Sequence, residues 1–147
     1  MKKIFLLLIA ALSLMTACKD DSLKERETIM EFIAANNFTA DETELGTFIV
    51  TQTEGTGVSP TSADNVEVRY TGSYLDGEVF DSSPDGDTVE FGMNQVIRGF
   101  SDGLAQMKEG GSAKLIIPSD LGYGSNPPGG IRRNAVLVFD VELVTVL

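Results

Sequence analysis

The chain has 147 residues, of which 42% are hydrophobic, a length and composition that suit one globular domain with a core of its own. It contains no histidine, which excludes histidine general bases, histidine-ligated metals and imidazole-dependent nucleophile triads. Its formal net charge of −11 opposes contact with nucleic-acid phosphates, so we exclude nucleic acid as a partner.

The first 18 residues carry the features of an export signal. A basic start precedes an apolar run over residues 4–14, and two small residues lead to Cys18, the only cysteine of the chain. This pattern predicts a secretory signal peptide over residues 1–17, because the apolar run is too short for a stable membrane span. Residues 15–18 resemble the lipobox of bacterial lipoproteins, in which the cysteine is lipidated and becomes the new N-terminus. An ordinary signal peptide followed by a stray cysteine is the alternative.

Lipidation at Cys18 implies an exported protein, lipid-anchored to a membrane at the periplasmic face or the outer surface of a Gram-negative envelope. Loss of residues 1–17 removes two lysines and no acids, which leaves nine basic and 22 acidic residues and a net charge of −13. Lys19-Asp20-Asp21 resembles a surface-export signal of some Gram-negative lipoproteins. A solvated acidic tether explains these residues equally well, so the membrane face stays open.

We expect residues 18–44 to form a tether that contains a short helix. Ile29, Phe32 and Ile33 follow the i, i+3, i+4 spacing of an amphipathic helix, and the two asparagines at residues 36–37 suit its end. Such a helix would pack on the main domain or serve as a dimerisation arm. A partly ordered spacer is the plainer interpretation of the same segment.

From Leu45 onward the pattern changes to short strands separated by turns. Val66, Val68 and Tyr70 alternate with polar residues, which is the period of a half-buried strand. Similar patterns predict six strands, over residues 47–52, 66–70, 78–81, 88–93, 113–117 and 135–146.

One helix is predicted over residues 99–108, with Phe100, Leu104 and Met107 on one face. A glycine pair at residues 110–111 suits its end. One apolar helix face is about the right size to cover one apolar sheet face. The elements therefore predict an α+β domain, an antiparallel sheet of about five to six strands with one short α-helix.

Four motifs occur in a fixed order: VRYTGSYLDGEVFDSS, QVIRGFSDGLAQMKEGG, AKLIIPSDLGYG and AVLVFDVEL. Together they resemble the FKBP-type peptidyl-prolyl cis-trans isomerases, over residues 45–147. The family fold is a twisted antiparallel β-sheet wrapped around one short α-helix, in agreement with the predicted elements. The resemblance implies an isomerase that rotates X-Pro bonds in Pro-containing polypeptide segments of exported proteins and uses no cofactor.

The resemblance also implies which residues form the active site. The register at Val89 depends on where a short deletion falls. Phe100 stands where many members carry tryptophan, so we expect altered packing of a prolyl ring there. The catalytic roles fall on Asp81, Tyr123 and Phe80. The substrate-binding pocket falls on Tyr70, Val89, Val96, Ile97, Phe100, Ile131 and Phe139.

Each polar role in this site has a plainer alternative. Asp81 would direct its carboxylate at the twisting amide or hold the Tyr70 hydroxyl, whereas a capping role in the turn beside it is the alternative. Tyr123 would donate its hydroxyl to one substrate carbonyl, and the Ile97 backbone N–H would bind another. A loop tyrosine packed on the core is the alternative for Tyr123, and Phe139 would serve pocket and core together.

The loop after Tyr123 departs from the family pattern. Ile131-Arg132-Arg133 stands where many members have Ile-Pro-Pro. Two arginines in place of two rigid prolines predict a more mobile and locally positive lip, which would favour substrates with acids near proline. The resemblance implies macrolide inhibitors as further ligands, and the same change leaves their affinity open.

Prolyl isomerisation needs no histidine. An X-Pro bond rotates over a barrier of ~18–20 kcal/mol because resonance holds it planar, and a pocket that favours the twisted form lowers that barrier. A tethered chaperone or adaptor that binds Pro-containing segments with little or no turnover is the alternative function. Asp85 and Asp87 are too sparse an acidic pair for a calcium site, so we expect no metal.

Overall fold

The computed structural model describes residues 20–147. The predicted signal peptide and the predicted lipidation site at Cys18 lie outside the described residues. A first helix, α1, occupies residues 20–35 of the described chain. The other elements follow in the order β1 (Asp41–Glu42), β2 (Phe48–Thr53), β3 (Asn65–Tyr74), β4 (Val79–Ser82), β5 (Val89–Gly92), α2 (Arg98–Ala105), β6 (Ser112–Ile117), the 3₁₀ helix η1 (Ser119–Leu121) and β7 (Leu137–Val146).

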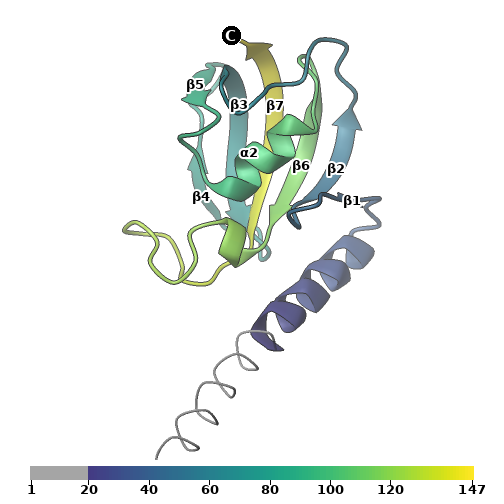
Figure 1. Ribbon diagram of the computed structural model, residues 1–147. Coiled ribbons are helices and arrows are strands. Elements are labelled where there is room, and N and C mark those ends of the chain that lie inside the picture. The colour runs from purple at the N-terminus through teal and green to yellow at the C-terminus, as the bar shows by residue number, and fades with distance from the viewer. Residues whose placement is uncertain (1–19) are drawn as a thin grey trace, which may run out of the picture.

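Within residues 20–147, seven strands form one antiparallel sheet, six of them in the order β1-β2-β6-β7-β3-β4 and the seventh, β5, paired with β3 off this path. The two longest strands, β3 and β7, pair along its centre from Val66 opposite Val146 to Tyr74 opposite Leu137. β5 pairs with the first half of β3 and β4 with the second half, so both lie on the same edge of β3. Figure 1 shows the sheet curving around α2.

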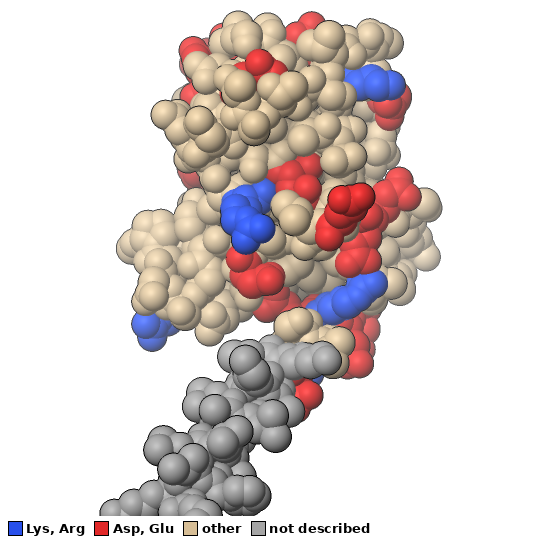
Figure 2. Space-filling view, in the orientation of Figure 1, with Lys and Arg blue, Asp and Glu red and all other residues tan. Residues whose placement is uncertain are grey.

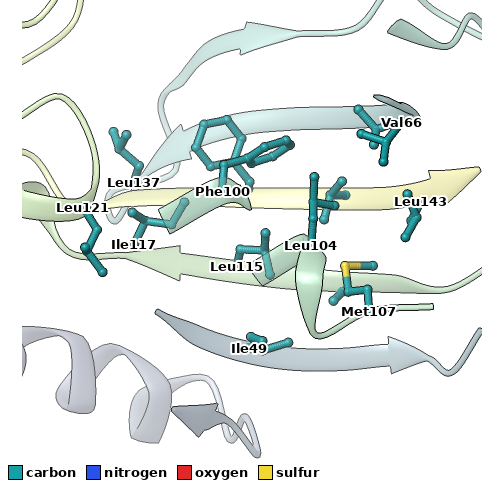
Figure 3. Close-up of a cluster of buried hydrophobic side chains, with 14 of the residues drawn as sticks. Ile49, Val66, Phe100, Leu104, Met107, Leu115, Ile117, Leu121, Leu137 and Leu143 are labelled. Atoms are coloured by element: carbon teal, nitrogen blue, oxygen red, sulfur yellow. The ribbon is translucent and has the colours of Figure 1, made fainter. Parts of the chain in front are cut away.

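α2 lies close against the concave face of the sheet because two glycines face β6. A Cβ added at Gly99 would stand 2.3 Å from Ile117 Cγ2, and one added at Gly103 would stand 2.7 Å from the Leu115 side chain. Both distances are shorter than carbon atoms tolerate, so any larger residue would push the helix off the sheet. The predicted apolar stripe is buried in the resulting core (Figure 3), with Phe100 and Leu104 on α2 and Met107 just past its end at Ala105.

One end of the opposite face of the sheet is covered by α1 (Figure 1). Ile116 and Val138 point to this face, because they alternate along β6 and β7 with the residues that pack against α2. Ile29 and Ile33 of α1 are 0% and 8% exposed and belong to the same apolar cluster. The predicted short helix therefore packs on the main domain over residues 20–35, and a partly ordered spacer is wrong there.

The surface is strongly acidic. On the face that carries α2, acidic side chains outnumber basic ones (Figure 2). Within the described part of the chain, no helix is both long and apolar enough to cross a membrane.

The predicted α+β fold class is confirmed. Each predicted strand has a counterpart, and the Asp76-Gly77 turn joins β3 to β4 with Gly77 at a φ of 88°. Two short elements were not predicted. β1 has only two residues, too few to show a period, and η1 has three residues just before a stretch rich in glycine and proline.

Candidate active site

A cavity of about 240 Å³ opens between the start of α2 and the concave face of the sheet. Seven of the ten residues predicted for the active site line it together: Tyr70, Asp81, Val96, Ile97, Phe100, Tyr123 and Phe139. They come from β3, β4, the turn before α2, α2 itself, the loop after η1, and β7. Phe91 and Gln95 complete the lining.

Aromatic rings form most of the apolar wall. The Tyr70 ring centroid lies 5.8 Å from that of Phe91 and 6.2 Å from those of Phe100 and Phe139. Phe100 and Phe139 meet edge to face, with centroids 5.0 Å apart. These separations suit favourable aromatic packing, so the rings hold one another in place and leave the hollow between them.

Asp81 and Tyr70 form the polar edge of the cavity. The Tyr70 hydroxyl donates a hydrogen bond to Asp81 Oδ2 at 2.8 Å, and Asp81 Oδ1 accepts one from the Ser82 N–H at 2.9 Å. The carboxylate therefore holds the tyrosine, and its second oxygen binds the next backbone N–H within β4 and does not cap a turn. The exposed carboxylate keeps a fixed position at the mouth of an otherwise apolar hollow.

Both tyrosines of the cavity retain their protons well into alkaline pH. Burial, followed by the hydrogen bond to Asp81 and the charge of that carboxylate, raises the pKa of Tyr70 to about 12. Burial also raises the pKa of Tyr123, and the Asp81 charge adds to the effect. Tyr70 therefore keeps the proton that it donates to Asp81, and the Tyr123 hydroxyl is available as a hydrogen-bond donor.

Two residues that line the cavity, Tyr123 and Ile97, carry candidate hydrogen-bond donors. Tyr123 lies between Gly122 and Gly124, whose N–H groups both donate to the Ser119 carbonyl, at 3.1 and 2.9 Å. Ile97 immediately precedes α2, and within residues 20–147 its N–H makes no hydrogen bond. A buried or half-buried N–H without a partner is costly, so this group suits a ligand carbonyl.

Residues 57–144 match the sequence model of one family, described as FKBP-type peptidyl-prolyl cis-trans isomerase. The chain belongs to this FKBP-type family. It is 41% identical over 129 residues to the FKBP-type peptidyl-prolyl cis-trans isomerase FkpA of Aeromonas hydrophila, covering 86% of this chain and 48% of the relative. The chain thus spans about half the length of that relative.

Two crystal structures share the fold. The FkpA structure from Escherichia coli superposes with a TM-score of 0.74 at 30% identity, covering 99% of this chain and 70% of that one. A peptidyl-prolyl cis-trans isomerase from Pseudomonas syringae gives a TM-score of 0.73 at 34% identity, covering 87% of this chain and 94% of that one.

Phe80 does not line the cavity of this FKBP-type domain. Its ring lies behind Phe139, at a centroid distance of 5.6 Å and an angle of 89°, and beside Tyr74 at 5.0 Å. Gly72 leaves room for this arrangement, since a Cβ there would stand 2.8 Å from both phenylalanine rings. Phe80 therefore supports the wall and does not form its surface.

Phe91 occupies the wall position that we predicted for Val89. Val89 pairs with Val68, and Phe91 pairs with Val66 one step further along the same face. The Phe91 ring lies against Tyr70 and Phe100, whereas Val89 does not border the cavity. The two residues are two apart in one strand, so alternation alone does not distinguish them. The feature of the sequence that favours Phe91 as the wall residue is its aromatic ring.

Ile131 also lies outside the lining of the cavity. Its neighbour Arg132 clamps the loop to the turn between β3 and β4, by ion pairs with Asp76 at 2.8 Å and Glu78 at 2.5 Å. The guanidinium stacks 4.1 Å above the centroid of the Tyr74 ring. The hydrogen bond that Arg132 donates to Asp76 raises the pKa of the Arg132 guanidinium. The pKa of Asp76 is lowered, first by the hydrogen bond from the Glu78 N–H and then by the one from Arg132.

The prediction of a positive lip is therefore wrong at Arg132, because Asp76 and Glu78 compensate the charge of its guanidinium. Arg133 has no ion pair within the described chain, and its Nε donates to the Ser125 carbonyl at 2.9 Å. Arg132 ties the loop to the turn between β3 and β4, and Arg133 braces the loop internally, by contacts that two prolines would not make.

Proposed function

We propose that this FKBP-type domain accelerates cis–trans rotation of X-Pro bonds in exported proteins. The observation that carries the proposal is the cavity itself, an aromatic-walled hollow of about 240 Å³ with one fixed carboxylate at its edge. Uncatalysed rotation takes tens to hundreds of seconds, which is slow enough to limit folding. A prolyl ring has the size and polarity to enter such a hollow.

Preferential binding of the twisted imide is the proposed source of acceleration. The planar X-Pro bond is polar because resonance separates charge between its nitrogen and oxygen, and rotation breaks that resonance. The rings of Tyr70, Phe100 and Phe139 offer less solvation to separated charge than water does, so they favour the twisted form. A hundredfold to ten-thousandfold gain needs only ~3–5.5 kcal/mol.

The polar groups orient the substrate about this wall. Tyr123 and the Ile97 N–H donate to carbonyls on either side of the proline, which fixes the chain while one bond rotates. Asp81 presents its carboxylate to the rotating amide and holds the Tyr70 hydroxyl. The proposed steps form no covalent bond and transfer no proton.

A protease-coupled assay with a short X-Pro peptide tests this function. We expect the wild type to accelerate cis-to-trans exchange, and Asp81→Leu to reduce kcat/KM by roughly tenfold or more. Asp87→Leu is the matched control, because Asp87 is exposed and lies outside the cavity. Absence of acceleration by a folded wild type would refute the proposal and leave only binding of Pro-containing segments.

We further propose that the mature chain is a lipoprotein anchored through Cys18 in a Gram-negative envelope. The support is the sequence alone: a basic start, an apolar run and the lipobox-like residues before Cys18. Growth with a labelled fatty acid should label the wild type, and Cys18→Ala should lose both the label and the membrane fraction. Equal labelling of the two proteins would refute lipidation at this position.

Macrolide inhibitors are the second proposed class of ligand for the same cavity. Its aromatic wall and the Tyr123 and Ile97 donors supply the contacts that a large apolar ring with carbonyl groups needs. Inhibition of the isomerase assay by a macrolide is the expected result, and unchanged rates at saturating macrolide would exclude this ligand.

A further inference from the structure

A carboxylate from α1 binds the loop that carries Tyr123. Glu25 Oε1 accepts the Ser119 N–H at 2.5 Å, and Glu25 Oε2 accepts the Ser119 hydroxyl at 2.7 Å. The two residues are 94 positions apart and both are part-buried. A carboxylate that accepts two hydrogen bonds from one residue holds it in both position and orientation.

Ser119 is also the residue that positions Tyr123. Its carbonyl accepts the N–H groups of Gly122 and Gly124, the two neighbours of Tyr123. Ser119 therefore binds Glu25 through its donors and fixes the Tyr123 backbone through its acceptor. Its N–H is the first donor after Pro118, and within residues 20–147 Glu25 is the only acceptor for that group.

We propose that Glu25 is a positioning residue for the isomerase reaction, acting through Ser119 on the Tyr123 hydroxyl. The inference rests on the proposed function of the cavity, and it extends the active site to α1. That helix lies outside the residues that match the family, 57–144. Loss of the carboxylate frees the Ser119 N–H and hydroxyl, and Tyr123 then samples orientations in which its hydroxyl misses the substrate carbonyl.

Simple docking of α1 is the competing explanation for the contact. α1 is already held by the burial of Ile29 and Ile33 and by the Arg26–Glu42 ion pair at 2.7 Å. If the Glu25 carboxylate only helped to dock α1, its removal and the removal of the Glu42 carboxylate would have the same effect on kcat/KM and on amide exchange. Variants that separate the two cases are available on α1 and β1.

The experiment compares Glu25→Ala with two controls in the full chain. Glu31→Ala removes an exposed glutamate of the same helix that makes no hydrogen bond in the described chain, and Glu42→Ala removes the docking ion pair. We expect Glu25→Ala to lower kcat/KM by roughly five- to tenfold and both controls to keep wild-type rates. Glu25→Gln keeps one carbonyl acceptor for the Ser119 N–H and should recover most of the loss.

Two further readouts decide whether the effect passes through Tyr123. Amide hydrogen exchange at Gly122 and Gly124 should speed up in Glu25→Ala and stay at wild-type rates in Glu42→Ala. In a Tyr123→Phe background, which lacks the hydroxyl, Glu25→Ala should cost no further activity. Unchanged exchange, or the same fold loss in that background, would overturn the proposal.

Failure of the proposed function is distinguishable from failure of this inference. If the wild type had no isomerase activity, the exchange at Gly122 and Gly124 would still report whether Glu25 holds the loop. If the wild type were active and Glu25→Ala matched it in both rate and exchange, the cavity would stand as the active site and Glu25 would have no part in it.

Discussion

Tyr70 joins the wall of the cavity to its polar edge, since its ring contacts three phenylalanines and its hydroxyl binds Asp81. The hydrogen bond is useful only while the phenol keeps its proton. Burial and Asp81 together ensure that it does, because they disfavour the phenolate.

The raised pKa of Tyr70 makes a prediction about alkaline pH. In the unfolded chain the phenol titrates at its ordinary value of 10.0, and in the folded protein at about 12. Below the first value both states are protonated, so Tyr70 adds no pH dependence. Between the two values only the unfolded state loses the proton, so the free energy of unfolding falls as pH rises. Urea denaturation at roughly pH 9 and 11 should show this fall, and Tyr70→Phe should reduce it.

Gly72 makes a prediction about the wall behind the cavity. Gly72→Ala places a methyl group 2.8 Å from the rings of Phe80 and Phe139, so the rings must move. We expect a loss of about 1–3 kcal/mol in the free energy of unfolding and a lower kcat/KM. Gly129→Ala is the control, because no atom lies within 4 Å of a Cβ there. Equal stability of the two variants would show that the rings adapt freely.

At the scale of elements, the turn between β3 and β4 and the loop before β7 act as one unit. Arg132 joins them, and Asn134 ties the same loop to Gly124 by an N–H bond of 2.8 Å to its carbonyl. The loop that follows Tyr123 is therefore anchored at its far end by charge and stacking.

Arg132→Ala should change substrate binding more than stability. The ion pairs are exposed, and such pairs contribute about 1 kcal/mol or less to the free energy of unfolding. We expect a rise in KM of roughly two- to fivefold with little change in kcat. Arg132→Lys should not restore KM, since an ammonium lacks the planar fork that binds two acids and stacks on Tyr74. A wild-type KM in Arg132→Ala would show that the clamp has no part in binding.

At the scale of the whole molecule, α2 packs on the concave face of the sheet, and α1 packs on one end of the opposite face. Ile29 is the α1 residue most completely removed from solvent, with 0% of its surface exposed. The helix therefore belongs to the fold of the domain as well as to the connection with the preceding residues.

Ile29→Ala tests the contribution of α1 to stability. Truncation of a fully buried isoleucine costs about 2–5 kcal/mol, because transfer free energy is lost and a cavity remains. Met30→Ala, at a neighbouring position that is 47% exposed, should cost far less. Urea denaturation measures both. An equally small loss in the free energy of unfolding of the two variants would mean that the sheet is stable without the packing of α1.

Local patterns predicted the strands and the helix because alternation and helical spacing are properties of neighbouring residues. The cavity residues Tyr70, Ile97 and Phe139 were found through the motifs around them. Phe91 was missed because it shares a face with Val89, so period alone does not separate them. The partners of Glu25 and Arg132 lie far away in sequence, and only the folded chain brings them together.

The central place of β7 has a consequence for synthesis. Within residues 20–147, β7 follows every other strand yet lies between β6 and β3, so the sheet stays in two unjoined parts until β7 inserts. It also brings Phe139, without which the hollow lacks part of its aromatic wall. A nascent chain whose residues 137–146 are still inside the ribosome therefore has no finished pocket, and removal of β7 should abolish the domain.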